Sequence, residues 1–196
     1  MKVKSKKILP KPPKAFTHAK LSASSAHRWL VCTGSVALSE NAPRTTSVYA
    51  AEGTFAHHIG STCLKDKKFR PEDWRDITEK VDGHDITCSQ DMIDAVNEYL
   101  AIVYSKLSAK DTLFVEQDFT PALIKLHPDF GGISDVVIWK PDLKKLIVYD
   151  YKHGAGVRVD VFNNTQLKYY ALGALLSCNL PASVVEVGII QPNYQG

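Results

Sequence analysis

Two aspartates and a lysine occupy positions from which carboxylates and an ammonium group can act together. Asp135 lies within the β-branched run of residues 133–139. An aspartate is unusual there, because strands disfavour this residue type and a buried carboxylate needs a partner. Asp150 and Lys152 are two residues apart at the end of a second such run, residues 145–151, so in a strand they project from the same face. The short link between the two runs suits a hairpin, and the pattern predicts two carboxylates and a cation at one place in a β-sheet.

This group of side chains suits the hydrolysis of phosphodiester bonds. Carboxylate oxygens are hard ligands of the kind that Mg²⁺ and Mn²⁺ prefer. A divalent ion neutralises charge on phosphoryl oxygens and lowers the pKa of a bound water, and Lys152 would orient that water or stabilise the developing charge. The alternative is a structural ion pair between Asp150 and Lys152, which is the more frequent meaning of an isolated Asp-x-Lys pattern. The preceding strand with its embedded aspartate favours the metal site.

The spacing of apolar residues changes once along the chain, from helical to strand-like. Helices are expected first, at residues 26–31, 49–66 and from an N-cap at Ser89 to about residue 107. Residues 33–48 are expected to be mostly loop and residues 65–85 a polar surface excursion. Strands and one helix follow, in the order strand 112–119, strand 133–139, strand 145–151, helix 162–178 and strand 184–190. We therefore predict the α/β fold class, with a mixed central β-sheet flanked by helices. The chain ends soon after the last strand, so this core is expected to be complete.

Charge is distributed unevenly along the 196 residues. The first 20 residues hold seven of the 24 basic residues and none of the 21 acidic ones, which leaves 17 basic and 21 acidic residues in the rest. Residues 1–20 are therefore expected to form a flexible basic arm, either a solubilising tail or a non-specific phosphate-binding segment. They lack the apolar middle of a secretory signal, and no apolar run is long enough to span a membrane. Four widely spaced cysteines indicate reduced thiols, so a cytoplasmic location without a membrane partner is expected.

Five short motifs occur in order along residues 21–196, and together they carry a family resemblance. They are LSASSAHRWL at residues 21–30 with Cys32, Gly34 and Ser35, then AEGTFAH at residues 51–57, GISD at 132–135, DYK at 150–152 and QLKYY at 166–170. In these motifs the chain resembles the PD-(D/E)XK nuclease superfamily in its RecB-like branch. It is most similar to an uncharacterised phage and prophage family with that nuclease core. The resemblance implies a restriction-endonuclease-like core over residues 21–196.

The resemblance also implies roles for particular residues. Asp135 and Asp150 would be the metal carboxylates, His57 and the carbonyl of Tyr151 further metal ligands, and Lys152 the catalytic lysine. Two more residues, Gln166 and Tyr170, would orient the site or touch the DNA backbone. The implied activity is Mg²⁺- or Mn²⁺-dependent cleavage of DNA, with an exonuclease in phage recombination or end processing as the first choice. DNA is then the partner, together with a phage single-strand annealing or recombination protein, in the cytoplasm of a bacterial host.

Several alternatives stay open at this point. The chain has an early cysteine, Cys32, but no late cysteine triplet, so the iron–sulfur cluster of some RecB-like relatives is not expected. Helical periodicity places His58, not His57, beside the apolar stripe of its helix, whereas the G-x-x-x-H spacing of the family selects His57. Glu116 and His153 are weaker candidates for the edge of the site. An inactive DNA-binding or assembly module with a nuclease fold, and a restriction-type endonuclease, are the rival functions.

Overall fold

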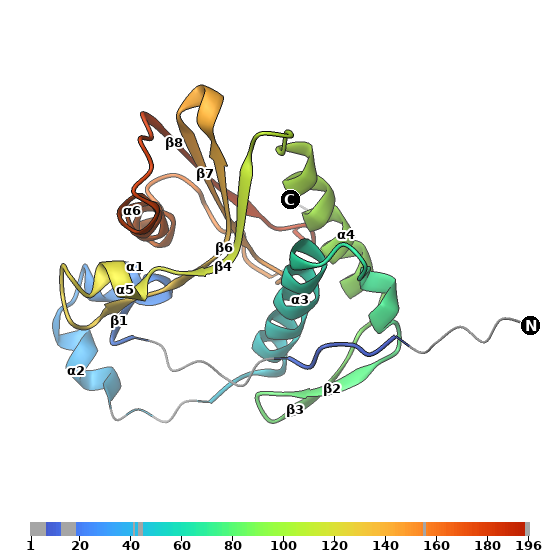
Figure 1. Ribbon diagram of the computed structural model, residues 1–196. Helices are drawn as coiled ribbons and strands as arrows, with labels where there is room; N and C mark the ends of the chain where they lie inside the picture. The colour runs from blue at the N-terminus through green and yellow to red at the C-terminus, as the bar shows by residue number, and fades with distance from the viewer. Residues whose placement is uncertain (1–6, 13–18, 41, 43–44, 155, 195–196) are drawn as a thin grey trace, which may run out of the picture.

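The centre of the molecule is a four-stranded mixed sheet, seen in the computed structural model in Figure 1. The structure describes residues 7–12, 19–40, 42, 45–154 and 156–194. The sheet has the strand order β4 (Thr112–Asp118), β6 (Ile133–Lys140), β7 (Lys145–Tyr151) and β8 (Val184–Ile190). The first three strands are antiparallel neighbours, and β8 runs parallel to β7 after a crossover through a helix. The mixed α/β fold class and all four strands are thus confirmed.

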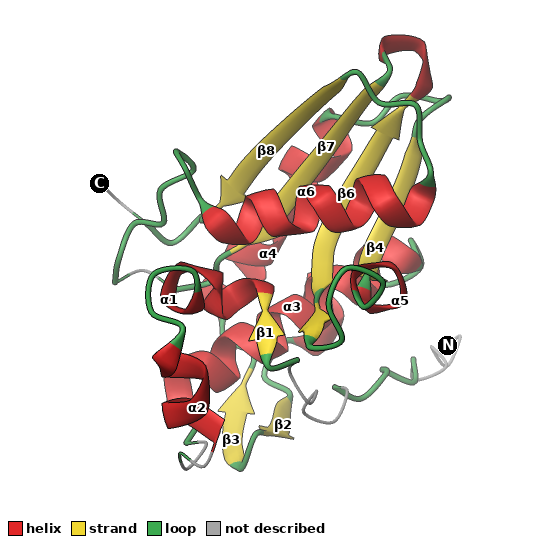
Figure 2. Ribbon diagram, turned by 90° about the vertical axis from the view of Figure 1, so that its left-hand side faces the viewer, coloured by secondary structure: helices red, strands yellow, loops and turns green. Residues whose placement is uncertain are grey.

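Helices cover both faces of this sheet (Figure 2). On one face, α6 (Thr165–Cys178) packs against the side chains of Val137 and Val148. On the other face, α3 (Val48–Lys65) and α4 (Gln90–Ser105) pack against Val136 and Ile147. Because side chains alternate along a strand, the apolar residues in the middle of β6 and β7 contribute to both layers of the core.

Shorter elements surround these layers. They are β1 (Leu21–Ser22), η1 (Ala23–Ser25), α1 (Ala26–Trp29), α2 (Gly34–Glu40), η2 (Pro71–Trp74), β2 (Thr78–Val81), β3 (His84–Thr87), α5 (Thr120–Leu123), β5 (Phe130–Gly131) and η3 (Pro141–Leu143). The expected cap of α4 is present, since the Ser89 hydroxyl accepts the amide of Met92 at 3.2 Å. Among the described residues, none of the helices combines the length and the apolar character needed to cross a bilayer.

Two of the expected connections are structured instead. Residues 33–48 were expected to be loop, but α2 occupies seven of them without burying a residue. Residues 65–85 were expected to be a surface excursion, but they contain η2 and most of a hairpin, β2 and β3, and they bury Trp74 and Val81 in the core. Asp82 and Gly83 form the hairpin turn with φ of 48° and 90°, the left-handed conformations that a tight two-residue turn requires.

Part of the expected N-terminal arm lies against the body of the protein. Leu9 packs on the core cluster of α3 and α4, and the Pro10 carbonyl lies 2.9 Å from His58 Nε2, which must therefore be the donor. Lys7 forms an ion pair with Asp73. Residues 1–6 and 13–18 of the expected arm lie outside the described residues. Residues 7–12, in contrast, pass from η2, where Lys7 pairs with Asp73, to α3, where Pro10 contacts His58 (Figure 1).

Candidate functional site

The site lies where β6 and β7 separate. Their hydrogen-bonded pairing runs from Lys140 and Lys145 to Val136 and Tyr149, and no further pair follows. Beyond this point β6 continues beside β4 only, whereas β7 continues beside β8. We call the opening between Asp135 on β6 and Asp150 on β7 the fork. Both carboxylates lie one residue past the last pair, on the face of the sheet that α6 covers.

Asp135 is held on both of its oxygens. Its Oδ2 accepts the backbone amide of Tyr151 at 2.7 Å, so a side chain takes the hydrogen bond that a neighbouring strand would otherwise make. Its Oδ1 lies 3.2 Å from His57 Nδ1 on α3. Burial opposes a charge on His57, but the carboxylate of Asp135 outweighs it and raises the pKa of His57 to about 9. Burial likewise opposes ionisation of Asp135, yet the contacts to His57 and to Tyr151 lower its pKa.

Asp150 is the most buried charged side chain of the site, with 3% of its side chain exposed. Its Oδ1 accepts the amide of Gln166 at 2.9 Å. Its Oδ2 lies 2.9 Å from Lys152 Nζ, but outside hydrogen-bonding geometry, and among the described residues this oxygen accepts no hydrogen bond. Burial and the nearby charge of Asp135 raise the pKa of Asp150 to about 6, although Lys152 opposes this.

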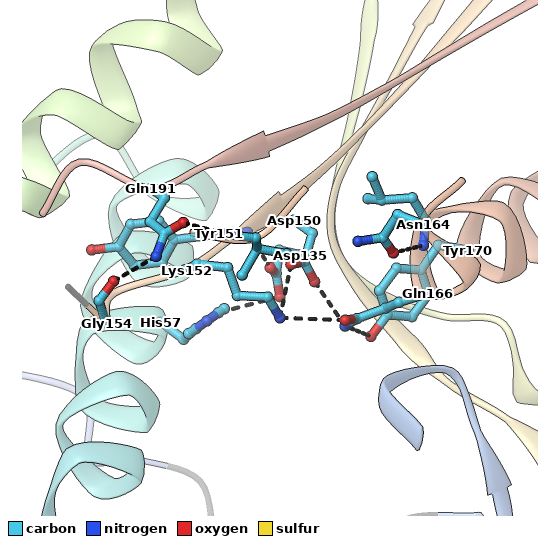
Figure 3. A network of polar contacts seen from close by, with 12 residues as sticks. His57, Asp135, Asp150, Tyr151, Lys152, Gly154, Asn164, Gln166, Tyr170 and Gln191 are labelled. Carbon is cyan, nitrogen blue, oxygen red and sulfur yellow. Dashed lines mark hydrogen bonds and ion pairs between the residues drawn. The ribbon is translucent and has the colours of Figure 1, made fainter. Parts of the chain in front are cut away.

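Two residues of α6 complete this network (Figure 3). The helix begins at Asn164, whose side chain accepts the amide of Leu167 at 3.1 Å and so places Gln166 in the first turn. The Gln166 amide nitrogen also donates to the Tyr170 hydroxyl at 3.2 Å, one helical turn further on. The Gln166 carbonyl accepts from Lys152 Nζ at 3.4 Å. The structure thus brings Lys152, Gln166 and Tyr170 to the same carboxylate.

Glu116 on β4 is the third carboxylate of the site. The register pairs Val115 with Val136 and Gln117 with Ser134, so Glu116 stands opposite Asp135. Ligand atoms of His57, Glu116 and Asp135 lie within 4.8 Å of one another. Burial, and then the charge of Asp135, raise the pKa of Glu116 to about 7. From the sequence, Glu116 is only a weaker candidate for the site, because its position depends on the pairing of β4 with β6.

The backbone is strained at Glu116, the residue of β4 that lies in the site. Its φ is 51°, in the left-handed region that costs a residue with a side chain about 1–2 kcal/mol. Such conformations persist where surrounding contacts impose them, and they cluster at functional sites. The irregular backbone leaves Glu116 without a paired residue in the register of β4 with β6, directly beside the fork.

The two adjacent histidines of α3 have different surroundings. His57 points to Asp135, with 31% of its side chain exposed. His58 is buried and points away from Asp135, so that it contacts the Pro10 carbonyl and lies edge-on to Trp74. The structure therefore places His57 and not His58 at the fork, as the motif spacing indicates.

Tyr151 and His153 line the edge of the site. The Tyr151 hydroxyl lies 2.9 Å from His153 Nδ1 on the side of the sheet that faces α3, and burial lowers the pKa of His153 to about 4. The role of the Tyr151 carbonyl as a metal ligand stays a prediction.

Two cavities meet at the fork. One, of about 650 Å³, is lined by Glu116, Lys152 and one face of α3. The other, of about 480 Å³, is lined by Glu116, Tyr170 and residues around β1 and β5. Glu116 is thus accessible from both cavities, whereas Asp135 and Asp150 lie deeper and line neither.

Comparison with known proteins places the chain in a family. A family model described as a protein of unknown function, DUF2800, matches residues 18–195. The chain belongs to the DUF2800 family. The match covers nearly all of the chain, including every residue of the fork, and the DUF2800 model begins close to β1. No solved structure matches the chain.

Proposed function

We propose that this DUF2800 chain is a nuclease that uses Mg²⁺ or Mn²⁺ to hydrolyse phosphodiester bonds of DNA, on a restriction-endonuclease-like core. The observation that carries the proposal is the convergence at the fork. Asp135 and Asp150 come from two separating strands, and Lys152 follows two residues after Asp150 and lies 2.9 Å from its carboxylate. These are the residue types that hydrolysis of a phosphodiester needs around one point.

The donor atoms at the fork suit a divalent cation. Asp135, Asp150 and Glu116 offer carboxylate oxygens, and His57 adds one imidazole, a set that fits Mg²⁺ or Mn²⁺. Asp150 Oδ2 is buried without a hydrogen bond among the described residues, and its one charged neighbour is the Lys152 ammonium group at 2.9 Å. A metal ion bound there would supply charge neutralisation for phosphoryl oxygens and would lower the pKa of water. His57 would have to give up its proton to become a ligand.

The chain's own residues would prepare the substrate. Lys152 provides a positive charge at the carboxylates, where an anionic phosphate would otherwise be repelled. Gln166 fixes both Lys152 and Asp150, because its carbonyl accepts from the ammonium group while its amide donates to the carboxylate. Tyr170 in turn accepts from that amide and so favours one orientation of it. Gln166 and Tyr170 are thus positioning residues.

We further propose that the activity removes nucleotides from DNA ends, as in phage recombination or end processing, with a single-strand annealing or recombination protein as a partner. An inactive DNA-binding module and a restriction-type endonuclease are the rival outcomes. A cytoplasmic location is part of the same proposal.

A nuclease assay with matched variants tests the proposal. End-labelled linear duplex, single-stranded DNA and closed circular plasmid are incubated with the protein in Mg²⁺, Mn²⁺ or EDTA. We expect metal-dependent loss from ends, and a decrease of about 100-fold or more in Asp150→Asn and in Lys152→Ala. The controls are Asp142→Asn and Lys110→Ala, which disrupt an exposed ion pair of the same residue types at the opposite end of the sheet.

The products separate the rival functions. Discrete fragments from the plasmid would indicate the restriction-type endonuclease. Binding of DNA without any metal-dependent cleavage would indicate the inactive module. Activity that survives in both Asp150→Asn and Lys152→Ala would show that the fork is not the active site.

A further inference from the structure

We infer that the groove along α3, with Lys11 at its edge, is a binding site for a single strand of DNA, in which Lys11 and Lys65 bind phosphates beside the fork. This inference rests on the proposed nuclease function and adds the form of the substrate and the residues that hold it. The groove is the cavity of about 650 Å³ that reaches the fork at Glu116 and Lys152.

The groove follows one face of α3. Its lining recurs along that helix at residues 50, 53–54, 57–58, 61–62 and 65, which is the spacing of a single helical face. From residue 50 to residue 65 this face is about 22 Å long, at about 1.5 Å per residue. A cavity of that length suits an extended chain better than a compact ligand.

The charge along the groove favours an anionic chain. Three ammonium groups line it, those of Lys11, Lys65 and Lys152, against the single carboxylate of Glu116. Lys152 is paired with Asp150, but within the part of the chain that the structure describes neither Lys11 nor Lys65 forms an ion pair. Lys65 is close enough to Glu116 to oppose the rise of its pKa.

The other cavity at the fork has the opposite character. Its charged lining includes Asp118 and Asp129 as well as Glu116, and its lysine, Lys20, is already paired with Glu40 at 2.6 Å. A phosphate chain is repelled there and attracted on the side of α3. The DNA strand is therefore expected to follow α3 as it approaches the fork.

The depth of the carboxylates selects a single strand. The side chains of Asp150 and Asp135 are only 3% and 14% exposed, so a phosphate has to enter the groove to reach them. A flexible single strand can bend into the groove, whereas a duplex, which is stiff over about 50 nm, keeps its phosphates outside.

Residues 7–12 bring Lys11 to the edge of the groove and set its position. Leu9 is anchored in the apolar core, and the Pro10 carbonyl accepts from His58. Lys11 follows directly and lines the groove. Two anchored residues immediately before it reduce the conformational freedom that its backbone must lose when a phosphate binds.

The salt dependence of binding tests this inference without cleavage. The fluorescence anisotropy of a labelled 12-residue oligothymidylate, and of a duplex of equal length, is measured with the full chain in EDTA between 50 and 200 mM salt. We expect the single strand to bind more tightly than the duplex. Lys11→Ala and Lys65→Ala should each make the slope of log K against log salt shallower by about 0.7. The loss of affinity between 50 and 200 mM salt should then be about 2.6-fold smaller than in the wild type.

Matched variants and the nuclease assay separate the possible failures. Lys65→Arg should keep the wild-type slope, and so should Lys110→Ala, which removes an equal charge far from the groove. Unchanged slopes in both groove variants, equal affinity for the duplex, or no binding of the oligonucleotide by the wild type would each overturn the inference. If cleavage still requires Asp150 in that case, the nuclease proposal stands and only the binding site is wrong. If no metal-dependent cleavage occurs, the nuclease proposal itself fails.

Discussion

Replacing Asp150 by asparagine should make the metal-free protein more stable while it removes the response to metal. Asp150 is almost completely buried, and it shares the fork with another carboxylate. An asparagine keeps the oxygen that accepts from Gln166 and removes the charge. Lys152 and Gln166 offset only part of the cost of burying the carboxylate, and a bound cation would offset the rest.

The size of this effect follows from the pKa of Asp150. Its value is raised from 3.8 to about 6, so between these values the folded state binds more protons than the unfolded state. Stability consequently falls as pH rises through this window and stays low above it. The loss corresponds to about 3 kcal/mol at pH 7.5 and to about half of that at pH 5. This is a large share of a typical unfolding free energy of about 5–15 kcal/mol.

Urea denaturation of wild type and Asp150→Asn tests this prediction. In EDTA the variant should be the more stable, with an advantage that grows from pH 5 to pH 7.5 towards about 3 kcal/mol. With Mn²⁺ at 100 times its Kd, the wild type should gain about 3 kcal/mol and the variant much less. Asp142→Asn, whose side chain is 66% exposed, is the control and should change little. A variant that is no more stable than wild type in EDTA, or whose advantage does not grow with pH, would refute the reasoning.

Three further predictions concern other residues. Asp135→Asn should destabilise the metal-free protein and lower the pKa of His57 from about 9 towards its ordinary value, which NMR titration of the imidazole signals would detect. Binding of Mn²⁺ should release protons from His57 and Glu116, the latter with a pKa of about 7, and calorimetry in buffers of different ionisation enthalpy should show less release and tighter binding as pH rises from 6 to 9. Gly188→Ala should lower the unfolding free energy by about 1–3 kcal/mol, because the added Cβ would lie 2.5 Å from the Tyr149 ring; a wild-type denaturation midpoint would contradict this.

The sheet could be predicted from sequence because its strands are continuous apolar runs. Residues 133–139, 145–151 and 184–190 are rich in β-branched residues, which favour strands buried on both faces. Asp135 and Asp150 stand out within this background, so the sequence alone predicts that they belong together. The parity of a strand also predicts that Lys152 shares a face with Asp150.

The hairpin of β2 and β3 was missed although a signal for it exists. Asp82-Gly83 is a dipeptide that favours a two-residue turn, and Val81 and Ile86 flank it. The many charged residues around it suggested a surface connection. Only the tertiary structure shows that Val81 and Ile86 pack against the core.

The sequence could not show which residues reach the site through the pairing of distant strands. Glu116 reaches the fork because β4 pairs with β6 in one particular register, and no local pattern encodes that register. The helix α2 was missed for the opposite reason. It buries no residue, so no apolar periodicity marks it among the loop-forming residues that follow.

The early end of the pairing between β6 and β7 determines more than the shape of the sheet. If β6 and β7 stayed paired for one more residue, Asp135 and Asp150 would be direct cross-strand neighbours. Their Cβ atoms would lie about 5 Å apart, and the two carboxylates would repel each other. The Tyr151 amide, which now bonds to Asp135, would be lost to the ladder. A small change in loop length or strand register would therefore disrupt the fork, although every acidic residue would still be present in the sequence. The last pair of β6 and β7, Val136 with Tyr149, therefore matters as much for the formation of the site as the presence of the two aspartates.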